Sequence, residues 1–274
     1  MAHADLLDTE RYRVLPGAPL DLDAHDPQDR QGAPNKAAGK ARLARLGERL
    51  DALQDLLYAE RRHRLLVILQ GMDTSGKDST IRHVFSVMDP LGLRAVSFGP
   101  PGPEARGRDY LWRIHRQVPA NGEIVIFNRS HYEDVLIARV RGLVSESDWR
   151  RRFGHIEDFE RMLVEEGTTV RKFFLNISKA EQADRLRERL ERPDKQWKFD
   201  PSDVSERQLW DEYRQAYADA LGRTSTEAAP WYVVPANRKW YRNLVVASVI
   251  VEALESLQMR YPPPAEGLDQ VRID

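Results

Sequence analysis

The sequence of 274 residues contains no cysteine. Disulfide bonds, thiolate metal sites and cysteine nucleophiles are therefore excluded, and this composition agrees with a reducing, cytoplasmic location. No apolar run approaches the roughly 20 residues of a membrane span. The first residues also lack the basic region and apolar stretch of a secretory signal. We therefore expect a cytoplasmic protein that does not enter a membrane.

An excess of charge of either sign is also missing. Lys and Arg together number 42 and Asp and Glu 43, which gives a formal net charge of -1. A global basic field for nucleic acid is absent, so nucleic acid is not an expected partner and any polyanion site must come from local clustering. Hydrophobic residues make up 41% and charged residues 31% of the chain, which is typical of a globular protein.

Five apolar runs predict buried strands at residues 64–70, 93–99, 123–128, 170–177 and 231–234. Helical patterns separate them, and this alternation indicates an α/β fold with a parallel sheet covered on both faces. Residues 1–35, rich in Pro, Gly, Asp and Ala, predict an extended N-terminal arm, and residues 36–274 predict a single domain. The charged segment at about 179–229 is too long for a simple crossover and predicts a lid.

A leucine pattern predicts a helix over residues 36–62. Steps of three and four place on one face the residues Leu43, Leu46, Leu50, Leu53 and Leu57. This face suits packing on the core, which we favour, or a short dimer seam.

The stretch 68-ILQGMDTSGKDSTIRHV-84 joins a predicted strand to a predicted helix through a glycine-bearing loop. Gly71 and Gly76 permit backbone angles that turn successive N–H groups toward phosphate oxygens, and Lys77 can reach the phosphate being transferred. A chance turn is the less favoured interpretation, because loop, lysine and flanking elements all agree. The expected phosphate-binding residues of this loop are Gly71, Thr74, Ser75, Gly76, Lys77, Asp78 and Ser79.

Two carboxylates stand in this anion-binding loop. Asp73 would repel phosphate unless a cation lay between them, and Mg²⁺ is usually held by one or two carboxylates together with phosphate oxygens. We therefore favour Asp73 as a metal ligand over an Asx-turn that only shapes the loop. Asp78 fits either a role in the loop or a carboxylate that stabilises the first helical turn.

A second apolar strand ends in polar residues, in 124-IVIFNRSHYEDV-135. Ligands of open parallel sheets lie beyond the carboxyl ends of the strands, so Asn128, Arg129, Glu133 and Asp134 are expected to face the same crevice as the loop. Arg129 suits a clamp for the charge that spreads over a transferring phosphoryl group. The alternative is a structural ion pair between Arg129 and Asp134.

Together these motifs resemble the second family of polyphosphate kinases, P-loop kinases that use inorganic polyphosphate as phosphoryl donor. The resemblance rests on 11-RYRVLPG-17, 57-LYAE-60, 68-ILQGMDTSGKD-78, 109-DYLWRIH-115, 127-FNRSHYEDV-135, 196-QWKF-199 and 230-PWYVVPANRKWYRNL-244. It implies a thymidylate-kinase-like fold, with a five-stranded parallel sheet between helices and a helical lid.

The resemblance also implies ligands. The loop form G-x-D-x-x-G-K-D accounts for both aspartates and implies Mg²⁺ at Asp73, with Mn²⁺ as an alternative. The order 128-NRSHYE-133 resembles the subgroups that phosphorylate nucleoside monophosphates, some of which continue to triphosphates, so Glu133 is tied to acceptor choice. Arg113 is a candidate acceptor clamp. The implied acceptors are AMP and ADP, with GMP and GDP as alternatives, and a homo-oligomer, dimer or tetramer, is expected.

Basic residues of the predicted lid suit a polyphosphate chain. Arg185 and Arg189 are four residues apart and share a helix face, where each guanidinium can bind two phosphate oxygens. With Lys198 they are expected to bind the donor, although a solvated charged helix is the usual explanation of such a run. Further candidates for phosphate contact follow the last strand, at Asn237, Arg238, Lys239 and Arg242.

One departure from the family pattern concerns the second strand. Gly99 stands where relatives often carry a lysine, and Arg106 or Arg108 is a candidate to compensate. Trp112, in the following helical pattern, is expected in the core rather than against a nucleobase.

The expected reaction is a Mg²⁺-dependent, reversible transfer of the terminal phosphoryl group of polyphosphate to a nucleoside mono- or diphosphate. Lys77 and Arg129 would neutralise the transferring group while Asp73 positions the metal. The alternatives are an ATP-dependent nucleotide kinase on the same fold and a non-catalytic module that binds polyphosphate.

Overall fold

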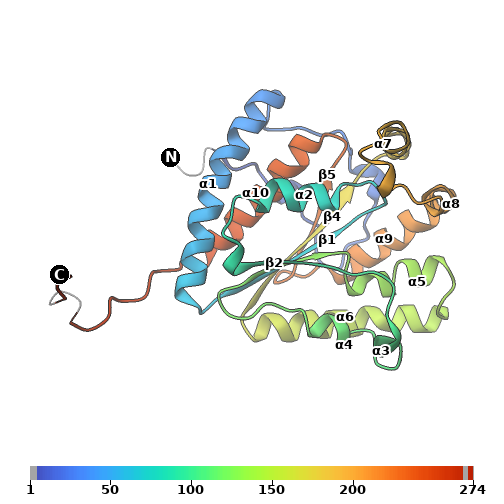
Figure 1. Cartoon of the computed structure of the whole chain (residues 1–274). Coiled ribbons are helices and arrows are strands. Elements are labelled where there is room, and N and C mark those ends of the chain that lie inside the picture. Colours follow the sequence, from blue (N-terminus) through green and yellow to red (C-terminus); the bar gives the residue numbers. More distant parts are fainter. Residues whose placement is uncertain (1–4, 268–270, 274) are drawn as a thin grey trace.

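The computed structural model describes residues 5–267 and 271–273. Its strands are β1 (Arg64–Gln70), β2 (Leu93–Ser97), β3 (Ile124–Asn128), β4 (Thr168–Asn176) and β5 (Trp231–Pro235). They form one parallel sheet in the order β2-β3-β1-β4-β5, with β1 at its centre (Figure 1). The expected P-loop kinase-like α/β fold with five parallel strands is therefore confirmed.

Helices connect the strands and cover both faces of the sheet. Their bounds are α1 (Lys36–Glu60), α2 (Lys77–Thr80), α3 (Pro103–Arg106), α4 (Trp112–His115), α5 (Ile137–Val140), α6 (Glu146–Glu165), α7 (Lys179–Glu191), α8 (Ser202–Gln208), α9 (Trp210–Thr224) and α10 (Lys239–Ser256). In Figure 1, α1, α2 and α10 lie on one side of the sheet and α5, α6 and α9 on the other. A π-helical turn, Ile81–Phe85, continues α2.

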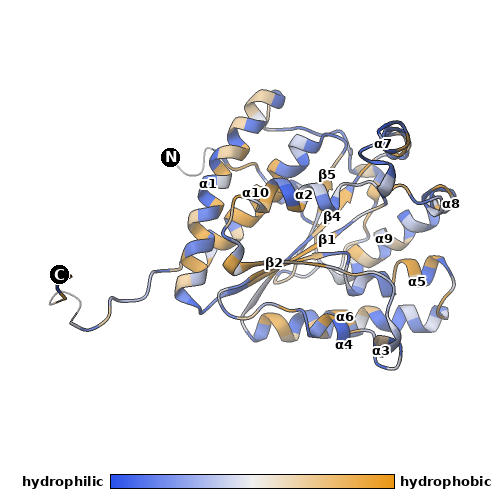
Figure 2. Cartoon of the chain, viewed as in Figure 1, coloured by the Kyte–Doolittle hydropathy of each residue, from blue (hydrophilic) through white to orange (hydrophobic). Residues whose placement is uncertain are grey.

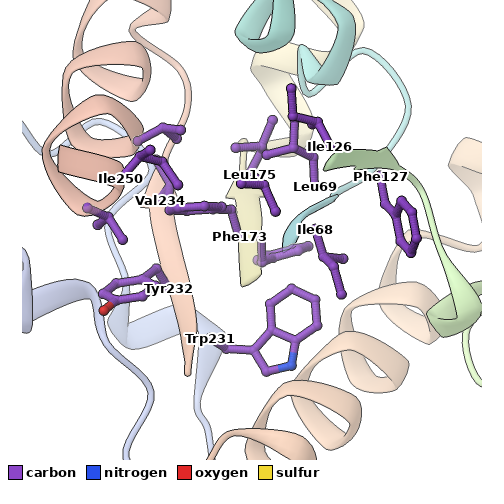
Figure 3. Close-up of a cluster of buried hydrophobic side chains, with 14 of the residues drawn as sticks. Ile68, Leu69, Ile126, Phe127, Phe173, Leu175, Trp231, Tyr232, Val234 and Ile250 are labelled. Atoms are coloured by element: carbon purple, nitrogen blue, oxygen red, sulfur yellow. The ribbon is translucent and has the colours of Figure 1, made fainter. Parts of the chain in front are cut away.

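The apolar runs of the sequence fill the centre of the sheet. The side chains of Leu65–Leu69 in β1 and Ile124–Phe127 in β3 are fully buried, as expected for strands covered on both faces. Figure 2 shows the strands as the most hydrophobic part of the chain, and Figure 3 shows side chains of four strands packing with Ile250 of α10.

The leucine face of α1 packs into the domain against α10. Leu46, Leu50, Leu53 and Leu57 are buried and Leu43 is partly buried. The core interpretation of this pattern is therefore confirmed, and these side chains are not free to form a dimer seam.

Residues 5–35 are mostly irregular but packed. Leu7, Tyr12, Val14 and Leu22 are buried. The backbone N–H of Val14 donates to the carbonyl of Trp231 at 2.9 Å, and Arg13 forms an isolated antiparallel bridge with Tyr232. The arm thereby covers the free edge of β5, which would otherwise present unpaired backbone groups.

The charged segment at about 179–229 forms α7, α8 and α9. Ala216, Ala220 and Leu221 of α9 are buried, and this helix packs against α5 and α6. Only α7 and α8, with the turn between them, project from the sheet toward the region beyond the strand ends (Figure 1). Of the segment predicted to form a lid, only these two helices project in this way, and their movement as a lid stays a prediction. Within residues 5–267 and 271–273, no helix is long and apolar enough to cross a bilayer.

Candidate active site

The loop after β1 has the backbone that its glycines allow. Gly71 and Gly76 adopt φ of 150° and 104°, and Thr74 also has a positive φ, 63°. A Cβ atom on Gly71 would lie 2.7 Å from Ser75 Oγ and 2.9 Å from the Leu175 carbonyl oxygen. Neither glycine can therefore be replaced without moving the loop. The loop closes with a hydrogen bond from Ser75 N–H to the Met72 carbonyl at 3.0 Å.

Lys77 is folded back onto this loop. Its ammonium donates to the carbonyls of Gly71 at 2.7 Å and Met72 at 3.4 Å. Its pKa is lowered from 10.5 to about 8, mainly by burial and also by Arg129, while the neighbouring carboxylates oppose the shift. A phosphate group bound in the loop would offer this ammonium a charged partner in place of neutral carbonyls.

Asp73 and Arg129 come together from the ends of β1 and β3. Arg129 Nη2 donates to Asp73 Oδ1 at 3.0 Å. Arg129 has a positive φ of 63°, and its N–H donates to the Leu69 carbonyl at 3.0 Å, which fixes the turn after β3 against β1. The structural pair anticipated as an alternative, Arg129 with Asp134, is not formed, because Arg129 turns to the phosphate loop.

Glu133 belongs to the same charged cluster. Burial raises its pKa, Arg129 and Lys77 act in the opposite direction, and Asp73 adds to the rise. Glu133 thus lies close enough for its pKa to be affected by the charges of Arg129, Lys77 and Asp73, the three residues expected to act on the transferring phosphoryl group. The structure brings these four side chains together from two separate stretches of the sequence.

Asp78 points away from its own helix start and across to β3. Its Oδ1 accepts from Asn128 Nδ2 at 2.7 Å, and Lys198 of the α7–α8 turn lies 3.9 Å from Oδ2. Asn128 also lies 3.4 Å from Ser97 Oγ at the end of β2. Asp78 therefore links the phosphate loop, the second strand end and the lid.

A second group of charges surrounds Asp134. Arg152 Nη1 donates to its carbonyl at 2.8 Å, and Arg113 Nη2 lies 4.0 Å from its Oδ2. Arg113 also donates to the Gly99 carbonyl at 2.6 Å. The expected acceptor residues Arg113 and Asp134 are therefore neighbours, at the ends of β2 and β3.

The residues proposed to compensate for Gly99 make local contacts, and their role in phosphate binding stays a prediction. Arg106 donates to the Pro101 carbonyl at 3.0 Å, and the Arg108 guanidinium stacks on Trp112 at 4.3 Å. Trp112 itself is only partly buried and lies between Arg108 and Arg116. The expectation that Trp112 is a core residue is therefore wrong, because cationic side chains rather than apolar ones cover its faces.

The prediction that Arg185 binds phosphate directly is contradicted by its contacts. Its side chain is buried, and Nη1 donates to the carbonyls of Thr74 and Ser75 at 2.9 and 3.0 Å. Nη2 donates to Ala236 and Asn237 carbonyls, and Nε donates to Glu181. All five N–H groups of the guanidinium are used. Arg185 therefore fastens the base of α7 to the phosphate loop.

Arg189 and Lys198 lie farther out on the lid. Arg189 Nη1 donates to the Lys198 carbonyl at 3.1 Å and to Asp203 Oδ2 at 3.2 Å. These contacts join α7 to α8. Lys198 lies 3.9 Å from Asp78 Oδ2, and its role in donor binding stays a prediction.

A buried polar network below the second motif was not anticipated. Lys172 of β4 and Glu160 of α6 form an ion pair at 2.5 Å, with side chains 0% and 2% exposed. Glu160 Oε1 also accepts from the Tyr132 hydroxyl at 2.9 Å and lies 3.2 Å from His131 Nε2. A lysine within an apolar strand was the available signal, but the partners on α6 could not be identified from spacing.

The carboxylates suit a cation that is shared with phosphate. Within the described ranges no three His, Asp or Glu residues cluster as a self-sufficient metal site. Asp73 nevertheless carries a partly exposed carboxylate at the loop. Together with burial, its negative charge raises the pKa of two other carboxyl groups, those of Glu133 and of Asp203 in α8. One or two carboxylates completed by phosphate oxygens and water are the donors that Mg²⁺ takes at such sites.

Comparison with known proteins identifies the family. The sequence model of the family described as Polyphosphate kinase 2 (PPK2) matches residues 33–262. The AMP/ADP-polyphosphate phosphotransferase of Meiothermus ruber is 53% identical over 266 residues, covering 97% of this chain and 100% of that protein. The ADP-polyphosphate phosphotransferase of Rhodopseudomonas palustris is 41% identical over 268 residues and 93% of each chain.

A solved structure agrees with the sequence relatives. The crystal structure of Polyphosphate Kinase 2 from Arthrobacter aurescens TC1 superposes with a TM-score of 0.92 at 45% identity, covering 95% of this chain and 93% of that one. With a matching family model, full-length relatives and the charged cluster at the strand ends, this chain belongs to the polyphosphate kinase 2 family.

Proposed function

We propose that this protein transfers the terminal phosphoryl group of inorganic polyphosphate to AMP and to ADP, in a reversible and Mg²⁺-dependent reaction. The cluster of Lys77, Arg129, Asp73 and Glu133 beside the phosphate loop carries the proposal. Similarity to relatives whose names specify AMP and ADP as substrates supports the choice of acceptor.

The donor binds along the phosphate loop. The loop N–H groups and Lys77 hold the terminal phosphates, and Arg129 neutralises the charge that spreads over the transferring group. Asp73 would contribute a ligand to Mg²⁺, and the ion would supply positive charge that neutralises the phosphates. Positioning and charge stabilisation account for most of the acceleration of phosphoryl transfer, so no covalent enzyme intermediate is required.

The acceptor lies beyond the ends of β2 and β3. Arg113 provides a guanidinium for the acceptor phosphate, and its ion-pair neighbour Asp134 helps hold it in place. Glu133 lies in the same turn after β3 as Asp134, next to the position of the transferring group. Its carboxylate there can influence how many acceptor phosphates fit beside Asp73. Each of the two transfers, to AMP and to ADP, breaks one phosphoanhydride bond of polyphosphate and forms another in the nucleotide, so the equilibrium constant is close enough to unity for either direction to run.

The experiment that tests the proposal separates donor from acceptor. Purified protein with Mg²⁺ is incubated with long-chain polyphosphate and, separately, AMP, ADP, GMP or GDP, and the nucleotides are resolved chromatographically. Conversion of AMP to ADP and of ADP to ATP is the expected result. Transfer that occurs only from ATP would replace the proposal with an ordinary nucleotide kinase, and no transfer from either donor would leave a binding module.

One variant and a matched control test whether Lys77 of the phosphate loop takes part in the reaction. Lys77→Met is expected to lower kcat/KM by about 100- to 1000-fold, the usual effect of removing one donor to a developing charge. Lys40→Met, an exposed lysine on α1, is the matched control and should retain wild-type activity. Equal activity of the two variants would remove Lys77 from the reaction.

A further inference from the structure

Arg242 of α10 occupies the space behind the phosphate loop. Its side chain is 0% exposed. Nη1 donates to the Ser75 carbonyl at 3.2 Å, and Nη2 donates to Ser79 Oγ at 3.1 Å. Nε and Nη2 both donate to Asn243 Oδ1, at 3.0 and 2.8 Å. Every one of these acceptors is a neutral oxygen.

The loop and this guanidinium fit each other closely. A Cβ atom at position 76 would lie 1.9 Å from Arg242 Nη1, so only glycine leaves room for the arginine. Two separate features therefore favour glycine at position 76: its left-handed backbone conformation and its close contact with Arg242. Because Arg242 contacts a carbonyl of the loop, it acts on a bound phosphate through the loop rather than by touching it.

The positive charge of Arg242 has no local counter-charge. Among the residues that the structure describes, no carboxylate forms an ion pair with it, and the charged group that influences it is another cation, Arg185. Arg185 is itself paired with Glu181 at 2.8 Å. Burial, together with the nearby charge of Arg185, lowers the pKa of Arg242 to about 9.

An uncompensated buried charge destabilises a fold, and replacing it with an apolar group of similar size removes that cost. An arginine in such a place is therefore explained best by a ligand that supplies the missing negative charge. The phosphate loop in front of it is the place where a polyanion would bind, on the donor assignment proposed above.

We propose that Arg242 is a positioning residue for the donor: its buried charge lowers the stability of the free enzyme and is compensated when polyphosphate occupies the loop. Binding of the anion and retention of the charge are then thermodynamically linked, so each strengthens the other. Lys77 touches the phosphate and Arg242 supports the loop from behind.

The test compares neutral and charged replacements. Arg242→Met and Arg242→Gln remove the charge, and Arg242→Lys keeps it with fewer hydrogen bonds. Thermal unfolding is followed without ligand and with inorganic tripolyphosphate as the probe, and KM is measured for polyphosphate and for AMP. Tripolyphosphate is not turned over without an acceptor, so the unfolding measurement does not depend on activity.

The neutral variants are expected to unfold at a higher temperature than wild type without ligand, by a few degrees. Tripolyphosphate should raise their Tm less than it raises that of wild type. Their KM for polyphosphate should rise about tenfold, with KM for AMP unchanged, and Arg242→Lys should stay closer to wild type in both respects.

Three outcomes would overturn the inference: neutral variants that are less stable than wild type or do not fold, an unchanged KM for polyphosphate, or equal increases in both KM values. Any of these would make Arg242 an ordinary structural residue. The proposed donor site fails separately, if tripolyphosphate does not stabilise the wild-type protein at all. Wild-type stabilisation that persists fully in Arg242→Met counts against the inference alone.

Discussion

At the scale of single residues, the site is organised around one ammonium that is held by its own loop. Lys77 donates to two backbone carbonyls, and burial lowers its pKa to about 8. A lysine with an ordinary pKa would stay charged well above physiological pH, whereas Lys77 begins to lose its proton there. Only the charged form can neutralise phosphate, so the proposed role of Lys77 predicts an activity that depends on pH through this residue.

We therefore expect kcat/KM for polyphosphate to fall as pH rises through about 8, because this quantity follows ionisations of the free enzyme. The fall in kcat should occur at higher pH, since bound phosphate favours the charged ammonium. Lys77→Arg keeps its charge throughout and should lose the alkaline limb, whatever its absolute rate. A pH profile of Lys77→Arg that matches wild type would show that another group titrates.

At the scale of elements, a buried network of polar side chains holds the turn after β3 in place. His131 and Tyr132 contact Glu160, and Lys172 donates to Tyr132 at 3.0 Å and to the Thr224 carbonyl of α9 at 2.7 Å. The flanking residues Arg129 and Glu133 belong to the candidate site. The network thus joins α6, β4 and α9 to the segment that carries these candidate site residues.

Breaking this ion pair from one side should be costly. Lys172→Met leaves the Glu160 carboxylate buried without its cation, and we expect a loss of about 3–5 kcal/mol in the free energy of unfolding. Adding Glu160→Leu removes the unpaired charge and should recover most of that loss. Urea denaturation of the wild type and the two variants measures this, and a double variant as unstable as Lys172→Met would refute it.

The elements themselves were largely predictable, and their contacts were not. Continuous apolar runs were enough to predict the five strands, and the spacing of the leucines was enough to predict the buried face of α1. Motif spacing likewise indicated the phosphate loop. Spacing carries no information on which acceptors a buried arginine donates to, so Arg185 was assigned to phosphate although it donates to loop carbonyls.

At the scale of the whole molecule, the sheet directs its charged residues to one end. The loop after β1, the turn after β3 and the base of α7 meet beyond the carboxyl ends of the strands, as ligand sites of open α/β sheets do. The arm contributes to the same end, since Asn176 donates to the His25 carbonyl at 2.9 Å and Asn237 N–H donates to the Pro27 carbonyl at 3.1 Å. Segments far apart in the sequence, including the N-terminal arm, therefore help to hold the site.

Two leucines of the arm test whether this packing stabilises the molecule. Leu22 is 4% exposed and Leu15 is 66% exposed, although both lie in the same irregular segment. Leu22→Ala should lower the free energy of unfolding by about 2–5 kcal/mol, because it leaves a cavity in the core. Leu15→Ala makes the same chemical change at the surface and should alter stability by no more than about 0.5 kcal/mol. Urea denaturation of the two variants decides the question: equal, small effects would mean that the arm is detached from the domain in solution, and a large effect of Leu22→Ala alone would make it part of the folding unit.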